Sequence, residues 1–259
     1  MFGSGAYSNT VVGGAYSNVM SGAAFSTFQA VAAPPPPAWT WNTEHPDSYA
    51  NTILLHHHED NAANTVVVDS SGNGFNSTAT ANTNGIYTIG GRFNGGFYAN
   101  DLFYATNVGA AFRLAIQAAL ASRVTIEFWI KNDSLDWSTQ GDQYEGMYFC
   151  TVANMINSFA YVSGINTIYF QYIAGGVTKN ITDIIIVDTN TWHHIASTID
   201  VPADEYKVYI DGAQIGLTQN GLGVWAGVNG TLYIPNDQTL GRTFDGVVDE
   251  FAASNVIRY

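Results

Sequence analysis

Cysteine is the residue that this 259-residue sequence comes closest to lacking. Its one cysteine, Cys150, excludes an intrachain disulfide, a zinc site built on several thiolates and a redox dithiol motif. Secreted domains of this size often carry disulfides, so we expect a protein that folds in a cytoplasm. The apolar run Met147–Val152 around Cys150 predicts a buried, unreactive thiol.

Positive charge is also scarce. Lysine and arginine number 8 against 21 acidic residues, which gives a net charge of −13. Eight cations spread along the chain cannot form the basic stripe that phosphate groups require, so nucleic acid and an anionic membrane surface are not expected partners. Charged residues make up 11% of the chain, against about 25% in an average soluble domain. Asn, Thr, Ser, Gly and Tyr must therefore cover the surface.

Long apolar runs are missing as well. No segment approaches the ~18 apolar residues of a membrane span, and Met1–Gly5 has no basic start of a secretory signal. We therefore expect no membrane insertion and no export. The many Asp and Asn loops leave open the binding of a hard cation such as Ca²⁺, and simple solubility is the alternative use of the negative charge.

A repeat of nine residues occupies the first 33 residues. Each of its three copies places one aromatic residue among small and polar neighbours: Tyr7, Tyr16 and Phe25. Such a segment buries too little surface to fold alone, and we expect its aromatic side chains to dock on a partner, in the manner of an added strand. A flexible tail with accidental repetition is the alternative. Pro34–Pro37 predicts a stiff polyproline II spacer, within a lead-in over 34–52.

From residue 53 to 259 the pattern is that of a β protein. Val124–Lys131 alternates as a half-buried strand does, and Tyr206–Ile210 does the same before the turn dipeptide Asp211-Gly212. Further strands are expected over 165–173, 181–187 and 191–200, and one helix over 110–121. Many short strands with hardly any helix predict an all-β, two-sheet antiparallel sandwich or jelly roll.

Five motifs follow one another along this region. They are the loop 69–74 (DSSGNG), the strands 124–130 (VTIEFWI), 192–196 (WHHIA) and 206–212 (YKVYIDG), and the closing segment 240–251 (LGRTFDGVVDEF). In this order they resemble the motifs of laminin-G-like domains, which have a concanavalin-like jelly-roll fold. The resemblance implies that fold, with Trp129 and Trp192 in the inter-sheet core. It leaves function open, because the fold serves adhesion, carbohydrate binding and plain structure alike.

The same resemblance implies a cation between the early loop and the closing segment. It maps onto Asp69, Asn73 and Asp249, and oxygen donors in loops suit Ca²⁺. In the alternative reading, Asp69 closes an Asx turn and Asp249 binds backbone amides. Ca²⁺ is the one cofactor that the resemblance implies.

Catalytic groups are hard to find. Concanavalin-like glycosidases use two carboxylates across a cleft, whereas Asp249 and Glu250 are adjacent and are expected on opposite faces of a strand. The run His56–His58 puts two imidazoles on one face, which is too few for zinc, and favours first-strand histidines. We therefore expect a protein that is not an enzyme. If it hydrolysed a polysaccharide, Glu127 and Glu250 would be the residues to test.

Carbohydrate binding requires exposed aromatic side chains near amides or carboxylates. The candidates are Trp137, Tyr144, Tyr148, Trp225 and Tyr233, whose exposure the sequence leaves open.

These observations predict a structural or adhesion component of a virus particle, such as a phage head decoration, head fibre or tail-associated protein. The arm would attach it to other virion proteins at the outer surface of the virion, and the sandwich would face solvent and contact host or environmental glycans. Assembly into symmetric oligomers is expected. A bacterial carbohydrate-binding module or adhesin is the alternative, and a concanavalin-like glycoside hydrolase is the third reading.

Overall fold

The computed structural model describes residues 8–12, 15–19, 49–86, 89–99, 106–132, 143–150, 154–162, 167–183, 190–225, 232–234 and 246–259. Contacts along the chain divide it into two compact units, Met1–His45 and Pro46–Tyr259. The sequence boundaries after residues 33 and 52 stay predictions.

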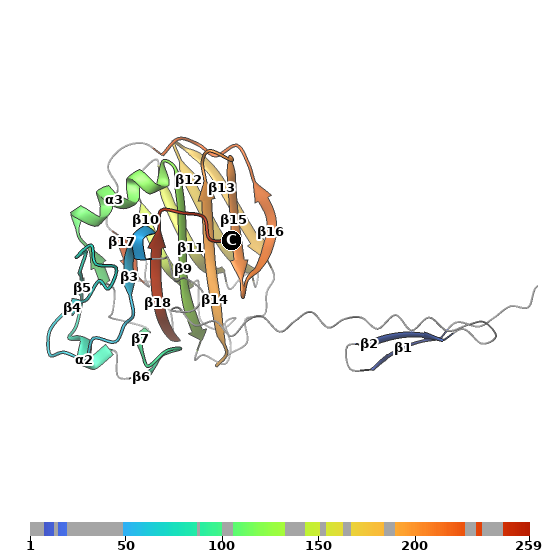
Figure 1. The fold of residues 1–259 in the computed structure, drawn as a ribbon, viewed down its shortest axis with the longest axis horizontal. Coiled ribbons are helices and arrows are strands. Elements are labelled where there is room, and N and C mark those ends of the chain that lie inside the picture. The colour runs from blue at the N-terminus through green and yellow to red at the C-terminus, as the bar shows by residue number, and fades with distance from the viewer. Residues whose placement is uncertain are drawn as a thin grey trace, which may run out of the picture. The chain divides into compact units, whose positions relative to one another are not determined.

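The first unit contains a β-hairpin. Strands β1 (Ser8–Val12) and β2 (Ala15–Val19) pair antiparallel, with Val11 opposite Tyr16 (Figure 1). The hairpin coincides with the first two copies of the nine-residue repeat, and a lone hairpin is marginally stable in water. Of the three aromatic residues predicted to dock, Tyr16 lies in β2, whereas Tyr7 and Phe25 lie outside the described residues.

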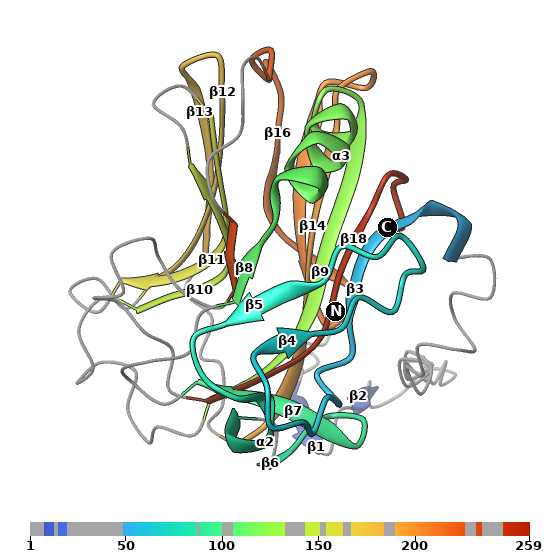
Figure 2. The same ribbon diagram turned by 90° about the vertical axis from the view of Figure 1, so that its left-hand side faces the viewer.

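In the second unit, the described strands form two eight-stranded antiparallel sheets, which Figure 2 shows edge-on. The sheet that we call the β12 sheet has the order β13 (Val177–Asp183), β12 (Thr167–Ala174), β11 (Met155–Val162), β10 (Gln143–Cys150), β17 (Leu232–Ile234), β8 (Thr106–Val108), β5 (Ser77–Ala79), β4 (Val66–Val67). The β9 sheet has the order β16 (Ala213–Gln219), β15 (Glu205–Ile210), β14 (Trp192–Asp200), β9 (Arg123–Asn132), β18 (Gly246–Ser254), β7 (Gly95–Ala99), β6 (Ile89–Gly90), and β3 (Thr52–His56) also pairs with β18. The predicted all-β sandwich is confirmed.

Alternation along each strand sends one set of side chains into the core between the sheets. Phe128 on β9 lies opposite Ile195 on β14, and both are fully buried. Phe170 of the β12 sheet joins the same cluster. Burial of one such side chain stabilises the fold by about 1.5–3 kcal/mol, so these rows hold the two sheets together. The strand expected over 181–187 begins earlier, at Val177, and its positions beyond 183 lie outside the described residues.

Helix α3 (Ala110–Leu120) lies at one end of the sandwich (Figure 1) and agrees with the predicted helix. Phe112, Ile116 and Leu120 recur every four residues and are fully buried, which is the pattern of a helix with one face on a core. The described residues also include the 3-10 turn η1 (Tyr49–Asn51) and the short helix α2 (Thr83–Ile86). Of the helices that the structure describes, none combines the length and apolar character needed to cross a membrane.

The turn between β15 and β16 confirms another local prediction. Asp211 and Gly212 have φ angles of 50° and 79°, and two consecutive residues with positive φ make the type I′ turn that suits a two-residue hairpin.

The prediction that Trp129 and Trp192 fill the inter-sheet core is wrong. Trp129 lies on the opposite face of β9, where its ring centroid is 5.1 Å from that of His194 and 6.1 Å from that of Phe93. The Arg92 guanidinium lies 4.8 Å from the same ring. Trp192 is half-buried. Both faces of β9 are therefore covered, because the loop that carries Phe93 and the C-terminal Tyr259 pack over the face opposite the inter-sheet core.

Candidate functional site

The loop predicted to hold a cation is built around the Asp69 carboxylate. Its Oδ1 accepts hydrogen bonds from the N–H groups of Leu55 (3.1 Å) and Ser71 (2.9 Å). Its Oδ2 accepts from the Ser71 hydroxyl (2.8 Å) and the Phe75 N–H (2.9 Å). An ionised carboxylate offers about four lone-pair sites, and donors meet all of them here. The bond from the Ser71 N–H closes an Asx turn, which was the alternative to cation binding predicted for Asp69.

Asn73 and Asp249 also make hydrogen bonds within the protein. The Asn73 amide nitrogen donates to the carbonyl oxygens of Thr52 (2.9 Å) and Ile53 (3.0 Å). Asp249, on β18, accepts from the N–H groups of Phe93 (2.9 Å) and Glu250 (2.8 Å). No group of three or more His, Cys, Asp or Glu side chains that could hold a metal occurs among the described residues. The carboxylate oxygens of Asp69 and Asp249 already accept hydrogen bonds from the protein. This arrangement does not fit a calcium centre, and calcium binding stays a prediction.

A β-bulge in β18 decides where Glu250 lies. The register with β9 shifts between Asp249 and Ala252, and Glu250 has a φ of 50°, which costs a non-glycine residue on the order of 1–2 kcal/mol. Glu250 Oε2 lies 2.8 Å from His57 Nδ1, and this bond raises the pKa of His57. Burial raises the pKa of Asp249 to about 8.

The other carboxylate of interest, Glu127, is fully buried on the outer face of the β9 sheet. Arg258 Nε lies 3.2 Å from its Oε1, and the Tyr259 hydroxyl donates to its Oε2 at 2.9 Å. His194 Nε2 lies 3.5 Å from Oε2. Two of these three contacts come from the C-terminal segment 255–259.

The histidine run belongs to the first strand of the sandwich and the turn after it. His56 and His58 are buried, with ring centroids 5.7 Å apart, and His56 Nε2 lies 3.1 Å from the Ser77 hydroxyl. Burial lowers the pKa of His56 to about 4 and lowers that of His58 well below its usual value. Both rings are therefore neutral at pH 7.

Amide and tyrosine side chains gather on the outer face of the β12 sheet. Gln171 on β12 lies directly opposite Asn180 on β13. The Asn180 carbonyl oxygen accepts hydrogen bonds from the Tyr169 hydroxyl (3.0 Å) and from the Gln171 amide nitrogen (3.0 Å), and this nitrogen also contacts the Tyr169 hydroxyl. Asn180 is exposed. Phe170 and Tyr172, which flank Gln171 along β12, point into the core. Among the described residues, no hydrogen-bond partner is found for the Asn180 amide nitrogen or the Gln171 carbonyl oxygen.

The pair Gln171–Asn180 belongs to a longer series of paired residues that crosses the sheet. From β13 to β5, each residue of the series pairs with the next one on the neighbouring strand: Asn180, Gln171, Asn157, Tyr148, Tyr233, Asn107 and Thr78. Directly paired residues lie level with one another across a sheet, and the two end members, Asn180 and Thr78, are both exposed. Seven strands at ~4.8 Å spacing give a row about 29 Å long. We call these seven residues the amide–tyrosine row.

The row includes two of the aromatic residues that the sequence offered for glycan binding, Tyr148 and Tyr233. A third, Tyr144, pairs with Ala160 on the neighbouring strand, and Trp137 lies outside the described residues. Trp225 is in the core, 5% exposed and stacked on Tyr172. The amides of the row were not among the residues predicted to bind a glycan. Alternation marks Gln171 and Asn180 as outward-facing, but only the pairing joins them to the tyrosines.

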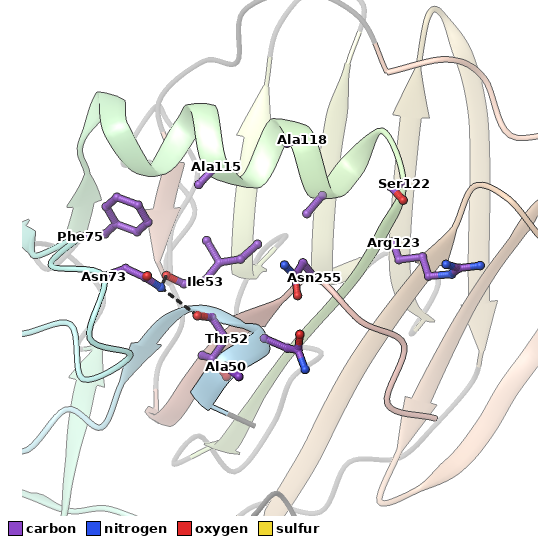
Figure 3. A pocket seen from close by; sticks show the side chains of 12 residues that line it. Ala50, Thr52, Ile53, Asn73, Phe75, Ala115, Ala118, Ser122, Arg123 and Asn255 are labelled. Atoms are coloured by element: carbon purple, nitrogen blue, oxygen red, sulfur yellow. Dashed lines mark hydrogen bonds between the residues drawn. The ribbon is translucent and has the colours of Figure 1, made fainter. Parts of the chain in front are cut away.

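A separate cavity of about 400 Å³ lies between α3 and the start of β3 (Figure 3). We call it the helix pocket. It is lined by Ala50, Asn51, Thr52, Ile53, Asn73, Phe75, Ala115, Ala118, Ala119, Ser122, Arg123 and Asn255.

A laminin G family model, described as the concanavalin A-like lectin/glucanases superfamily, matches residues 105–258. No curated protein matches the chain.

Solved structures share the fold at low sequence identity. The binding domain of Paraclostridial Mosquitocidal Protein 1 superposes with a TM-score of 0.60 at 17% identity, covering 80% of this chain and 49% of that one. The receptor binding domain of botulinum neurotoxin C/D mosaic serotype gives 0.58 at 15% identity, covering 80% and 48%. Domain 4 of AbnA, a GH43 extracellular arabinanase from Geobacillus stearothermophilus, solved with arabinotriose, gives 0.51 at 14% identity, covering 79% and 92%. The chain spans about half the length of the toxin domains. At these identities the likeness shows the fold alone.

Proposed function

Because this chain belongs to the concanavalin A-like lectin/glucanases superfamily, we propose that it is a non-enzymatic glycan-binding module. The amide–tyrosine row is the observation that carries the proposal. The proposal also has a more specific part: the N-terminal arm attaches the module to a larger assembly, and this assembly is the outer surface of a virus particle.

The chemistry of the row suits a neutral glycan chain. Primary amides can donate to and accept from sugar hydroxyls, and tyrosine combines an apolar ring with a polar hydroxyl. No member of the row is charged, in a protein with only 11% charged residues. A length of about 29 Å favours an extended chain over a single sugar.

The placement of the carboxylates supports a binding role over hydrolysis. A general acid must come within hydrogen-bond reach of its substrate. Glu127 is fully buried, with Arg258 and Tyr259 on its two oxygens, and Glu250 is 3% exposed and engaged with His57.

Two features support attachment through the arm. The nine-residue repeat recurs in register, and its first two copies form the hairpin β1–β2. A hairpin can add to the edge of a partner sheet. Under this proposal the partners are other virion proteins, and copies of the chain assemble symmetrically around the particle. A bacterial adhesin with the same binding face is the alternative. Incorporation of the chain into particles would favour the virion, and its display on a bacterial surface would favour the adhesin.

Binding can be tested on a glycan array with the full chain and two variants. Gln171→Ala removes one amide of the row, and Gln214→Ala is the matched control because Gln214 is exposed on β16 of the other sheet. Loss of about 1.4 kcal/mol of hydrogen bonding corresponds to a tenfold weaker Kd. We expect that loss for Gln171→Ala and no change for Gln214→Ala. A glycan that binds both variants as the parent does would place the binding site elsewhere. Hydrolysis of a bound polysaccharide, abolished by Glu250→Gln, would overturn the non-enzymatic assignment.

A further inference from the structure

The helix pocket shares no residue with the amide–tyrosine row and has an apolar wall on one side. Ala115, Ala118 and Ala119 are three and four residues apart, so they share one face of α3. Phe75 closes the pocket beside them, with its ring centroid 6.1 Å from that of Phe112. Figure 3 shows α3 forming the upper wall and β3 with η1 the lower wall. A volume of about 400 Å³ lies within the range of ligand sites in proteins, about 300–1,000 Å³.

Three asparagine side chains supply the polar side of the pocket. Asn73 has a fixed orientation, because its amide nitrogen donates to the Thr52 and Ile53 carbonyls (Figure 3), which leaves its carbonyl oxygen as an acceptor. Asn51 and Asn255 are held together by a backbone hydrogen bond of 2.9 Å from the Asn255 N–H to the Asn51 carbonyl. Within the part of the chain that the structure describes, neither of their side-chain amides has a hydrogen-bond partner. The pocket thus offers both donors and acceptors.

Charge is nearly absent from this lining. None of the lining residues carries a carboxylate. Arg123 is the single cation among them, and its Nε lies 3.2 Å from Asp200 Oδ2. In Figure 3 its side chain extends away from the other lining residues. A neutral ligand is therefore favoured over an anion.

We propose that the helix pocket binds one neutral sugar residue, with its hydroxyl groups on the three asparagine amides and its C–H face on the alanine wall. Hydroxyl groups that both donate and accept match the amides, and the apolar ring face of a sugar matches the alanines. The site is independent of the amide–tyrosine row.

The test uses the full chain and soluble probes: the methyl glycosides of glucose, galactose, mannose and N-acetylglucosamine. Saturation-transfer NMR identifies which probe binds, and calorimetry gives its Kd. Ala118→Leu fills the pocket at an exposed helix position, and Ala110→Leu adds the same side chain at an exposed position outside the lining. Both variants keep a good helix former in α3. We expect Ala118→Leu to weaken binding at least tenfold and Ala110→Leu to leave it unchanged.

Asn255→Ala provides a second variant at an exposed residue, should Ala118→Leu lower the melting temperature. We expect it to weaken the same probe several-fold. The proposal is overturned if no neutral probe saturates the protein, if both leucine variants bind as the parent does, or if glucuronic acid binds in preference and depends on Arg123. Gln171→Ala should leave the binding of the probe unchanged. Loss of probe binding in Gln171→Ala would assign the probe to the row and overturn the pocket. Array binding that persists without any probe binding would remove the pocket and leave the glycan-binding proposal intact.

Discussion

His56 is buried as a neutral ring, so acid should destabilise this protein in part through that one residue. Burial lowers the pKa of His56 from 6.5 to about 4. The unfolded chain takes up a proton at this position as the pH falls through 6.5, and the folded chain does so only near pH 4. Stability is therefore lost as the pH falls between these two values. From pH 7.5 to pH 4.5 the loss from this residue amounts to about 2.5 kcal/mol.

The perturbation that isolates this effect is His56→Gln. Glutamine can still bond the Ser77 hydroxyl, which lies 3.1 Å from His56 Nε2, and it does not titrate. Burial also lowers the pKa of His58, so His58 adds to the loss of stability in acid in both proteins. The effect of His56 is therefore the difference between the acid losses of the parent and of the variant. Urea unfolding of parent and variant, followed by the fluorescence of the six tryptophans, is measured at pH 7.5 and pH 4.5. We expect the parent to lose about 2.5 kcal/mol more than the variant.

His57 provides a control of opposite sign. Its bond to Glu250 raises its pKa, so its protonation stabilises the fold below pH 6.5 and this contribution disappears as the pH rises through the raised pKa. His57→Gln should therefore enlarge the acid loss. Equal acid losses in the parent and in His56→Gln would show that His56 is already protonated in the folded protein, and would refute the reasoning.

Other substitutions test the packing and the division of the chain. Arg258→Met leaves the Glu127 carboxylate buried without its cation and should lower the free energy of unfolding by about 3–5 kcal/mol in urea; a loss below about 1 kcal/mol would mean that water reaches Glu127. Phe128→Ala should cost about 3–5 kcal/mol through the cavity that it leaves, whereas Leu217→Ser, at a side chain that is 81% exposed, should change stability by less than about 0.5 kcal/mol in the same assay. Deletion of residues 1–33 should preserve the melting temperature of the sandwich and abolish co-sedimentation with the parent assembly; retained co-sedimentation would contradict attachment through the arm.

Local patterns were sufficient for much of the fold. The alternation in Val124–Lys131 predicts β9, and the four-residue spacing of Phe112, Ile116 and Leu120 fits α3. Asp211-Gly212 predicts its own turn, since the required φ angles depend on those two residues. Each of these features depends on neighbours in the sequence, which is why the sequence alone could predict it.

The candidate sites depend on residues that are distant in the sequence. The row joins Gln171 to Tyr148 and Tyr233 only through strand pairing, and the helix pocket brings Asn51 beside Asn255. Alternation shows which residues share a face of one strand, but it does not show which strands become neighbours.

The sequence by itself determined the strands, the helix, the tight turn and the fold family of this protein. The tertiary structure alone decided that Trp129 lies outside the inter-sheet core, that Glu127 is buried under Arg258, and that the bulge at Glu250 directs its carboxylate toward His57. The physical reason is the range of the interactions. Propensity and periodicity act over a few residues, whereas burial and strand register are set by segments that fold together from opposite ends of the chain.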